Sequence, residues 1–135
     1  MSEHRRVYLI GGEDDEEALF TLYEYASTCR LSCNYRGKQI EAAATDFFDA
    51  LCKIRTQLWE ERLIPFCYGA SLNVYPSGMG RDMGRGLKAY QMTKGKHATI
   101  ADLVDIFAEG PDVIPATIET QKEFWEEWLA APRTS

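Results

Sequence analysis

The N-terminal third of the chain shows the apolar patterns of β-strands. Residues 6–10 contain a short apolar run that ends at two glycines, which predicts a strand. Residues 18–26 fit one face of a helix, but their aromatic content and the segment that follows favour a strand. That segment, residues 31–43, has two short β-like runs on either side of Arg36-Gly37-Lys38. We therefore expect a β-hairpin with a glycine turn.

The clearest helical signal follows at residues 46–62. Apolar side chains recur there at spacings of four, three and four residues, at Phe47, Leu51, Ile54 and Leu58. Thr45 or Asp46 can accept hydrogen bonds from the free N–H groups of the first turn, which marks the beginning of the helix. Pro65 prevents its continuation. This segment therefore predicts an amphipathic helix.

Two further helices are predicted in the C-terminal part of the chain. Thr99 stands three residues before Asp102, which is the spacing of a helix-capping pair, and an apolar stripe follows. We expect this helix to continue to residue 109, because Gly110 and the proline after it are typical of a helix end. Residues 117–130 carry tryptophans on one broad side and glutamates mainly elsewhere. That pattern predicts a helix that lies against a sheet.

Short strands are also predicted at residues 64–68 and 87–92. Strands are thus concentrated early in the chain and helices late, and neither repeats nor linker-like stretches divide it. A chain of 135 residues has the size of one domain and can bury about two-thirds of the surface that its unfolded form exposes. We predict a single α+β domain, residues 1–135, with an antiparallel or mixed sheet and about three helices packed on it.

The composition is that of a globular protein, with 45% hydrophobic and 27% charged residues. No apolar run approaches the length of a signal-peptide core or of a membrane span, from which we expect a cytoplasmic protein without membrane association. The four cysteines form no Cys-x-x-Cys pair, and both histidines are distant from them in sequence. We expect reduced, mostly buried thiols, no metal site and no cofactor.

Charge is unevenly distributed along the chain. The formal net charge is −6, which argues against general nucleic-acid binding. Residues 13–17 are five consecutive acidic residues, and acidic residues also dominate after Thr99. Between these regions, residues 77–98 hold five basic residues against Asp82 alone, a local net charge of +4. Such polarity can orient a partner protein, although solvated charge runs often have no such role.

The most informative segment is residues 67–90, which hold five of the chain's ten glycines. Glycine permits close backbone approach at an entropic cost, so we expect something to lie close to this segment. Neither G-x-G-x-x-G nor G-x-x-x-x-G-K-[ST] can be drawn through it. Three interpretations remain: a structured connection between two strands, an interaction surface, and a pocket for a small anion. The candidate binding residues are Asn73, Tyr75, Arg81, Asp82, Arg85 and Lys88, of which Arg81 and Asp82 could instead tie the segment to the rest of the domain.

Catalytic chemistry is not recognisable in the sequence. Nucleophilic catalysis requires a Ser, Cys or Thr with a base in reach. Cys67 and Ser71 are near the glycine-rich segment, but neither sits in a G-x-S-x-G nucleophile elbow. His97 lies in a lysine-rich stretch typical of an exposed turn, and the glutamates of residues 119–127 have the spacing of a solvated helix face. We expect a protein that is not an enzyme.

Residues 65–90 and 102–107 together resemble a group of small bacterial proteins, some of which are similar to immunity proteins encoded beside secreted polymorphic toxins. The resemblance covers the chain from Pro65 to Phe107 and brings no catalytic residues with it. It implies a non-enzymatic protein-binding domain that neutralises a cognate bacterial toxin, whose toxin domain would be the protein partner. The alternative function is a module that binds a small anion or a nucleotide through the segment Gly78–Lys88.

Overall fold

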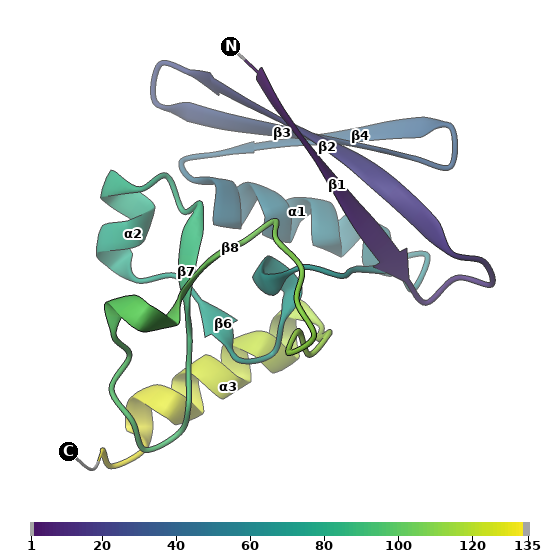
Figure 1. Ribbon diagram of the computed structural model, residues 1–135. Coiled ribbons are helices and arrows are strands. Elements are labelled where there is room, and N and C mark those ends of the chain that lie inside the picture. The colour runs from purple at the N-terminus through teal and green to yellow at the C-terminus, as the bar shows by residue number, and fades with distance from the viewer. Residues whose placement is uncertain (1, 134–135) are drawn as a thin grey trace.

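The computed structural model describes residues 2–133, which form two antiparallel β-sheets and three α-helices (Figure 1). The larger sheet consists of β1 (Ser2–Ile10), β2 (Glu16–Tyr25), β3 (Thr28–Tyr35), β4 (Lys38–Ala44) and β5 (Ile64–Pro65). The smaller sheet consists of β6 (Val74–Tyr75), β7 (Lys88–Gln91) and β8 (Leu103–Asp105). The helices are α1 (Phe47–Trp59), α2 (Gly78–Met83) and α3 (Ile118–Ala130).

The elements are arranged in layers around α1. The larger sheet has the strand order β4-β3-β2-β1-β5 and curls over one side of α1 as a half-barrel, while the smaller sheet and α3 lie on the other side (Figure 1). The smaller sheet has the order β6-β7-β8, and α2 lies beside this sheet at the periphery of the molecule. The α+β class with antiparallel strands is therefore confirmed, although the strands form two sheets rather than one.

The strands expected in the N-terminal third are present. β1 is longer than expected, because residues 2–5 also pair with β2. Residues 18–26 lie almost entirely in β2, so the strand interpretation of this ambiguous segment is confirmed. The hairpin of β3 and β4 turns at Arg36 and Gly37, which have φ angles of 50° and 72°. Positive φ at both central residues is the signature of a type I′ turn, the connection that suits the twist of a two-residue hairpin.

Helix α1 packs its apolar side against the concave face of the larger sheet. Asp46 caps the helix, and its Oδ1 accepts a hydrogen bond from the N–H of Asp49 at 2.7 Å, as the sequence indicates. The helix buries six apolar residues together with sheet residues such as Phe20 and Leu31. Full burial of one large apolar side chain stabilises a fold by about 1.5–3 kcal/mol. The six are Phe47, Phe48, Ala50, Leu51, Ile54 and Leu58.

The prediction of a helix after Thr99 is wrong. The capping pair forms, since Asp102 Oδ2 accepts from the N–H of Thr99 at 2.8 Å. It closes only one 3₁₀ turn, residues 100–102, before the chain extends into β8 and pairs with β7. Ile100, expected on a buried stripe, is 82% exposed. The apolar run has helical spacing, but its structure is determined by strand pairing. Strand pairing is a long-range contact that local periodicity cannot reveal.

Three other elements differ less from expectation. The strand expected at residues 64–68 stops at Pro65, and a 3₁₀ turn, Tyr68–Ala70, follows. The strand expected at residues 87–92 is confirmed as β7. The last predicted helix is confirmed as α3, and it lies against β6, where the ring of Trp125 stacks on that of Tyr75 with centroids 4.5 Å apart.

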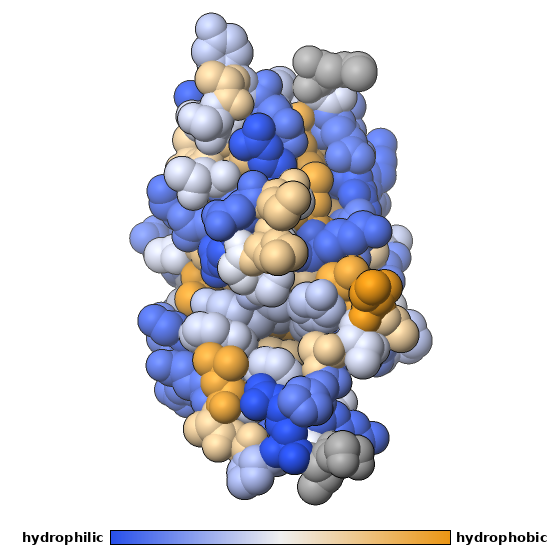
Figure 2. All heavy atoms as spheres, turned by 90° about the vertical axis from the view of Figure 1, so that its left-hand side faces the viewer, coloured by the Kyte–Doolittle hydropathy of each residue, from blue (hydrophilic) through white to orange (hydrophobic). Residues whose placement is uncertain are grey.

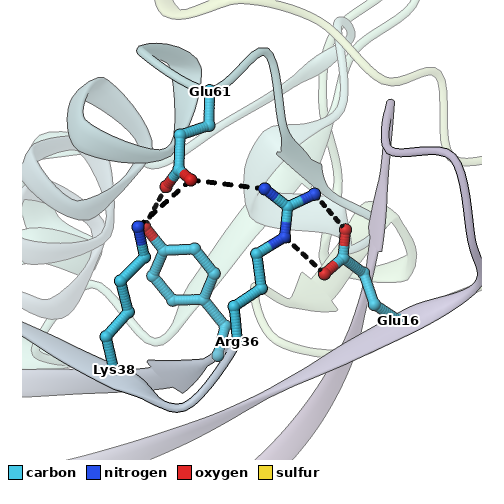
Figure 3. Close-up of polar contacts among 5 residues, drawn as sticks. Glu16, Arg36, Lys38 and Glu61 are labelled. Carbon is cyan, nitrogen blue, oxygen red and sulfur yellow. Dashed lines mark hydrogen bonds and ion pairs between the residues drawn. The ribbon is translucent and has the colours of Figure 1, made fainter.

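A group of polar side chains, the hairpin cluster, fixes the β3–β4 turn to the end of α1 (Figure 3). Its members are Glu16, Tyr35, Arg36, Lys38 and Glu61. Arg36 binds both carboxylate oxygens of Glu16 at 2.7 and 2.8 Å, and Glu61 accepts from Arg36 at 3.2 Å, from Lys38 at 3.1 Å and from the Tyr35 hydroxyl. The Arg36 hydrogen bonds lower the pKa of Glu16, and those from Tyr35 and Lys38 lower the pKa of Glu61. Burial and the Glu61 carboxylate raise the pKa of Tyr35 to about 12.

Candidate interaction surface

Helix α2 lies in the glycine-rich segment between β6 and β7. Ser77 caps it by accepting the Gly80 N–H on its Oγ at 2.9 Å, and Gly84 ends it by donating its N–H to the Gly80 carbonyl at 2.9 Å. The segment is therefore an ordered connection between two strands, while the interaction surface and the anion pocket stay predictions. The sequence does not predict the helix, because glycine has low helix propensity and four of these residues fall within the segment 78–86.

Gly86 explains part of the concentration of glycine in this segment. Its φ is +68°, and a Cβ there would lie 2.8 Å from Asp46 Oδ1 and 3.0 Å from the backbone nitrogen of Phe48. Next to it, the N–H of Phe47 donates to the Arg85 carbonyl at 2.7 Å. The chain after α2 thus lies directly against the beginning of α1, at a distance that leaves no room for a side chain.

Arg81 holds α2 to the rest of the domain. Its Nη1 lies 3.2 Å from Oδ2 of Asp46, whose side chain is only 6% exposed. The Arg81 guanidinium also lies over the rings of Phe48 and Tyr75, 5.1 and 5.6 Å from their centroids. Burial raises the pKa of Tyr75, whose ring also stacks on that of Trp125. Arg81 therefore ties the segment to the body, which was one of the two roles that the sequence allowed.

Two apolar side chains of α2 are largely exposed and line a hollow beside the smaller sheet. Met79 and Met83, one helical turn apart, are 72% and 81% exposed. Between α2 and the smaller sheet lies an open hollow of about 540 Å³, whose walls include Leu87, Tyr90 and Leu103. We call Met79, Met83, Leu87, Lys88, Tyr90 and Leu103 the α2 surface. Figure 2 views the molecule from the side that carries α2 and shows apolar side chains in separate patches between hydrophilic ones.

The cations of the glycine-rich segment have different surroundings. Arg81 is paired with Asp46, and the Nε of Arg85 lies 4.0 Å from a carboxylate oxygen of Glu24. Lys88 is exposed and lines the hollow. An anion cradle would draw several of these cations to one ligand. Arg81 and Arg85 already face carboxylates of this chain, and this arrangement favours an interaction surface over an anion pocket. The anion pocket stays a prediction.

The six candidate residues do not form one constellation. Tyr75 and Arg81 contact each other, whereas Asp82 is exposed on α2 and Lys88 is exposed on β7. Asn73 makes local structural contacts. Its side-chain oxygen accepts a hydrogen bond from the Ser71 hydroxyl at 3.1 Å, and its backbone carbonyl accepts one from the N–H of Met92 at 2.7 Å. The structure therefore joins two of the six and distributes the others around them.

Several residues of the region carry no signal of a site in the sequence. Asp46 is recognisable as a helix cap, but its pairing with Arg81, 35 positions away, is not. The stacking of Trp125 on Tyr75 joins segments that are even farther apart in sequence. Met79 and Met83 have the i, i+4 spacing of one helix face, and this is the signal that would have identified them had α2 been expected.

The nucleophiles considered from the sequence are buried. Cys67 is completely buried, and burial raises the pKa of its thiol to about 11. Ser71 is also inaccessible, and its hydroxyl donates to Asn73 and accepts the Ile114 N–H at 2.9 Å. His97 is exposed. A buried, protonated thiol and a hydroxyl already engaged twice are poor nucleophiles.

The remaining sequence expectations concern cysteines, metals and membranes. All four cysteines are free, and Cys29, Cys33 and Cys67 are buried, as expected of packing thiols. Within residues 2–133, no three His, Cys, Asp or Glu side chains are grouped closely enough to bind a metal ion. The helices of this part of the chain are also too short and too polar for any of them to cross a membrane.

Neither a protein-family model nor a curated protein matches the chain. The function therefore has to be inferred from the surface of the protein itself.

Proposed function

We propose that this protein is a non-enzymatic protein-binding domain that engages its partner through the α2 surface, and that the partner is a bacterial toxin domain which it neutralises as an immunity protein. One observation carries the proposal: two methionines one turn apart are 72% and 81% exposed on α2, a helix that the Arg81–Asp46 ion pair attaches to the rest of the domain. Exposed apolar groups next to a hollow are typical of a surface that another molecule covers.

The contacts that hold α2 against the domain support this role. A six-residue helix with two glycines is a weak structure by itself, since glycine costs about 1 kcal/mol relative to alanine in a helix. Here the buried Asp46–Arg81 pair and the stacked rings of Tyr75 and Trp125 hold it in place. A surface that is already ordered loses less entropy on binding, and methionine adapts its shape to a partner. The arrangement therefore combines a fixed base with adaptable contact groups.

The nature of the partner rests on charge and on resemblance. The chain has a net charge of −6, and residues 13–15 of its acidic run are exposed. An acidic protein is attracted over long range to a basic one, such as a nuclease toxin, and association then slows as salt rises. The α2 surface lies mostly in the locally basic segment 77–98, so this attraction acts through the net charge of the chain, and the α2 surface supplies apolar contacts. The segment that resembles immunity-protein relatives, residues 65–107, includes α2 and the hollow beside it.

The test is co-expression with the toxin gene encoded beside this one. We expect rescue of growth and a complex that co-purifies, with an association rate that falls between 50 and 500 mM NaCl. The double substitution Met79→Gln and Met83→Gln should weaken binding at least about 10-fold, because it removes two apolar contacts without changing side-chain length. Its melting temperature should stay close to that of the wild type, since both side chains are exposed.

A matched control is available on the larger sheet. Tyr8 is 49% exposed on β1, and Tyr8→Gln removes a similar amount of apolar surface away from α2. This variant should bind the toxin within about 2-fold of the wild type. Absence of both rescue and complex sinks the proposed function, whereas a complex equally insensitive to all three substitutions shows that a different surface binds.

A further inference from the structure

A second concave feature lies at the other end of α1, away from the α2 surface. It is a half-enclosed cavity of about 60 Å³ between the C-terminal half of α1, the β5 region and the first turn of α3. One water needs roughly 10–15 Å³ of such space, so a group of several non-hydrogen atoms fits. The cavity is lined by Arg55, Thr56, Trp59, Leu63, Ile64, Pro65, Ala116, Thr117, Ile118 and Glu119.

Arg55 is the buried polar group in the wall of this cavity. The residue is only 4% exposed. Its Nη1 donates to the Gly69 carbonyl at 3.1 Å and to the Gln121 Oε1 at 2.7 Å, and its Nη2 donates to the Ala116 carbonyl at 2.9 Å. A guanidinium has five N–H donors, so these three bonds to oxygen do not exhaust its capacity. The side chain is thus held in one position with hydrogen-bonding capacity to spare.

The positive charge of Arg55 lacks a direct counter-charge in the described part of the chain. Its three oxygen acceptors are carbonyl and amide groups, and no carboxylate of residues 2–133 lies within ion-pair distance of it. Burial lowers the pKa of the guanidinium, whereas the more distant Glu119 raises it. A buried charge is costly unless it is paired, so an anion beside Arg55 would be stabilised.

The walls define what kind of anion fits. Apart from Arg55, Thr56, Thr117 and Glu119, the lining is apolar and includes Trp59, Ile64 and Pro65. The cavity also adjoins the beginning of α3, whose partial positive charge has the sign that suits an anion. We propose that this cavity is a binding site for a small aliphatic carboxylate of the size of formate or acetate. Its carboxylate contacts the Arg55 guanidinium, and its short carbon chain contacts the apolar wall.

The experiment compares two sodium salts at equal concentration, acetate and gluconate, which carry the same charge but differ in size. At 100 mM we expect acetate to raise the melting temperature by about 3–6 °C relative to gluconate, which is too large for the cavity. The indole N–H signal of Trp59, assigned in the NMR spectrum by Trp59→Phe, should shift with acetate in a saturable manner. The two measurements report stabilisation and location separately.

The sign of one substitution sharpens the test. Glu119 is exposed at the rim and repels an anion, so Glu119→Gln should tighten acetate binding about 2–5-fold. Glu123→Gln, on the same helix but outside the cavity wall, should leave the affinity unchanged. Equal melting temperatures in acetate and gluconate, an unmoved Trp59 signal, or weaker binding by Glu119→Gln each overturn the site. The outcome is independent of toxin binding, since the α2 surface plays no part in it.

Discussion

The two sheets of this protein are stabilised in different ways. Strands β1 to β4 are 9, 10, 8 and 7 residues long and pair continuously around a helix with a fully apolar inner side. Strands β6, β7 and β8 have only 2, 4 and 3 residues. Beside the smaller sheet, the buried side chains of Arg55 and Gln121 donate hydrogen bonds to backbone carbonyls of the chain leading into β6, including that of Val74 in β6 itself. Where strands are short, single side chains carry more of the stability.

The strongest test of this difference is Gln121, the buried residue of α3. Its Nε2 donates to the carbonyls of Gly69, Ser71 and Val74 at 2.9–3.0 Å, and its Oε1 accepts from Arg55. Gln121→Leu removes the side-chain donor of the Ser71 and Val74 carbonyls and one partner each of the Gly69 carbonyl and Arg55. We therefore expect a loss of about 3–5 kcal/mol in the free energy of unfolding, measured by urea denaturation. A loss below about 1 kcal/mol would contradict the contrast between the sheets.

The control for that measurement lies next to it on the same helix. Lys122 is exposed, and Lys122→Leu should change the free energy of unfolding by no more than about 0.5 kcal/mol. Because both substitutions introduce leucine into α3, their difference isolates the buried hydrogen bonds from helix propensity.

A smaller effect is expected at Asp46, which connects the two regions. Asp46→Ala removes the cap of α1 and the partner of Arg81, and we expect a loss of about 2–3 kcal/mol, because Arg81 is 29% exposed and regains water. Asp46→Asn keeps a capping side chain and should lose only about 1 kcal/mol, measured in the same denaturation series. Equal losses for the two variants would show that the ion pair contributes nothing.

The smallest effect is expected in the hairpin cluster of the larger sheet, and it depends on pH. The raised pKa of Tyr35 means that its hydroxyl stabilises the fold below about pH 10 and that this contribution is lost as pH rises towards about 12. The lowered pKa values of Glu16 and Glu61 have the opposite sense. Their contribution is present above the pKa of an unfolded glutamate and is lost as pH falls through the lowered values.

Tyr35→Phe tests this directly. The variant should show a small decrease in melting temperature at neutral pH and a shallower decline between pH 10 and pH 12, both followed by circular dichroism. High salt should reduce the neutral-pH difference, since the Arg36 and Lys38 side chains of the cluster are 38% and 51% exposed. Identical alkaline slopes for the two proteins would exclude the Tyr35 hydroxyl as a contributor.

The larger sheet and its helix were largely predictable from the sequence. Spacing alone identified α1, because one of its sides is apolar throughout, and Gly37 marked the hairpin turn. The smaller sheet was not predictable as a whole. Its strands are too short for alternation to be recognised, and the capping pair of Thr99 and Asp102 formed but was followed by a strand rather than a helix.

The candidate site was likewise predictable only in part. Tyr75 and Arg81 were identified because an aromatic and a bidentate cation in a glycine-rich segment are typical of a binding region. The partners that give Arg81 its role, Asp46 and Phe48, belong to α1 and come close only in the folded chain. Arg55 and Gln121 were missed for a related reason, since a polar residue on an amphipathic helix looks like part of its exposed side until burial is known.

The position of Gln121 also bears on the order in which the protein assembles. Strands β1 to β4 are neighbours in sequence as well as in space, so they can pair while the rest of the chain is still being synthesised. The carbonyls of Gly69, Ser71 and Val74 receive their shared donor only after α3 has been made. Until then, the larger sheet and α1 can form without a completed smaller sheet, and we expect α3 to pack onto the domain last.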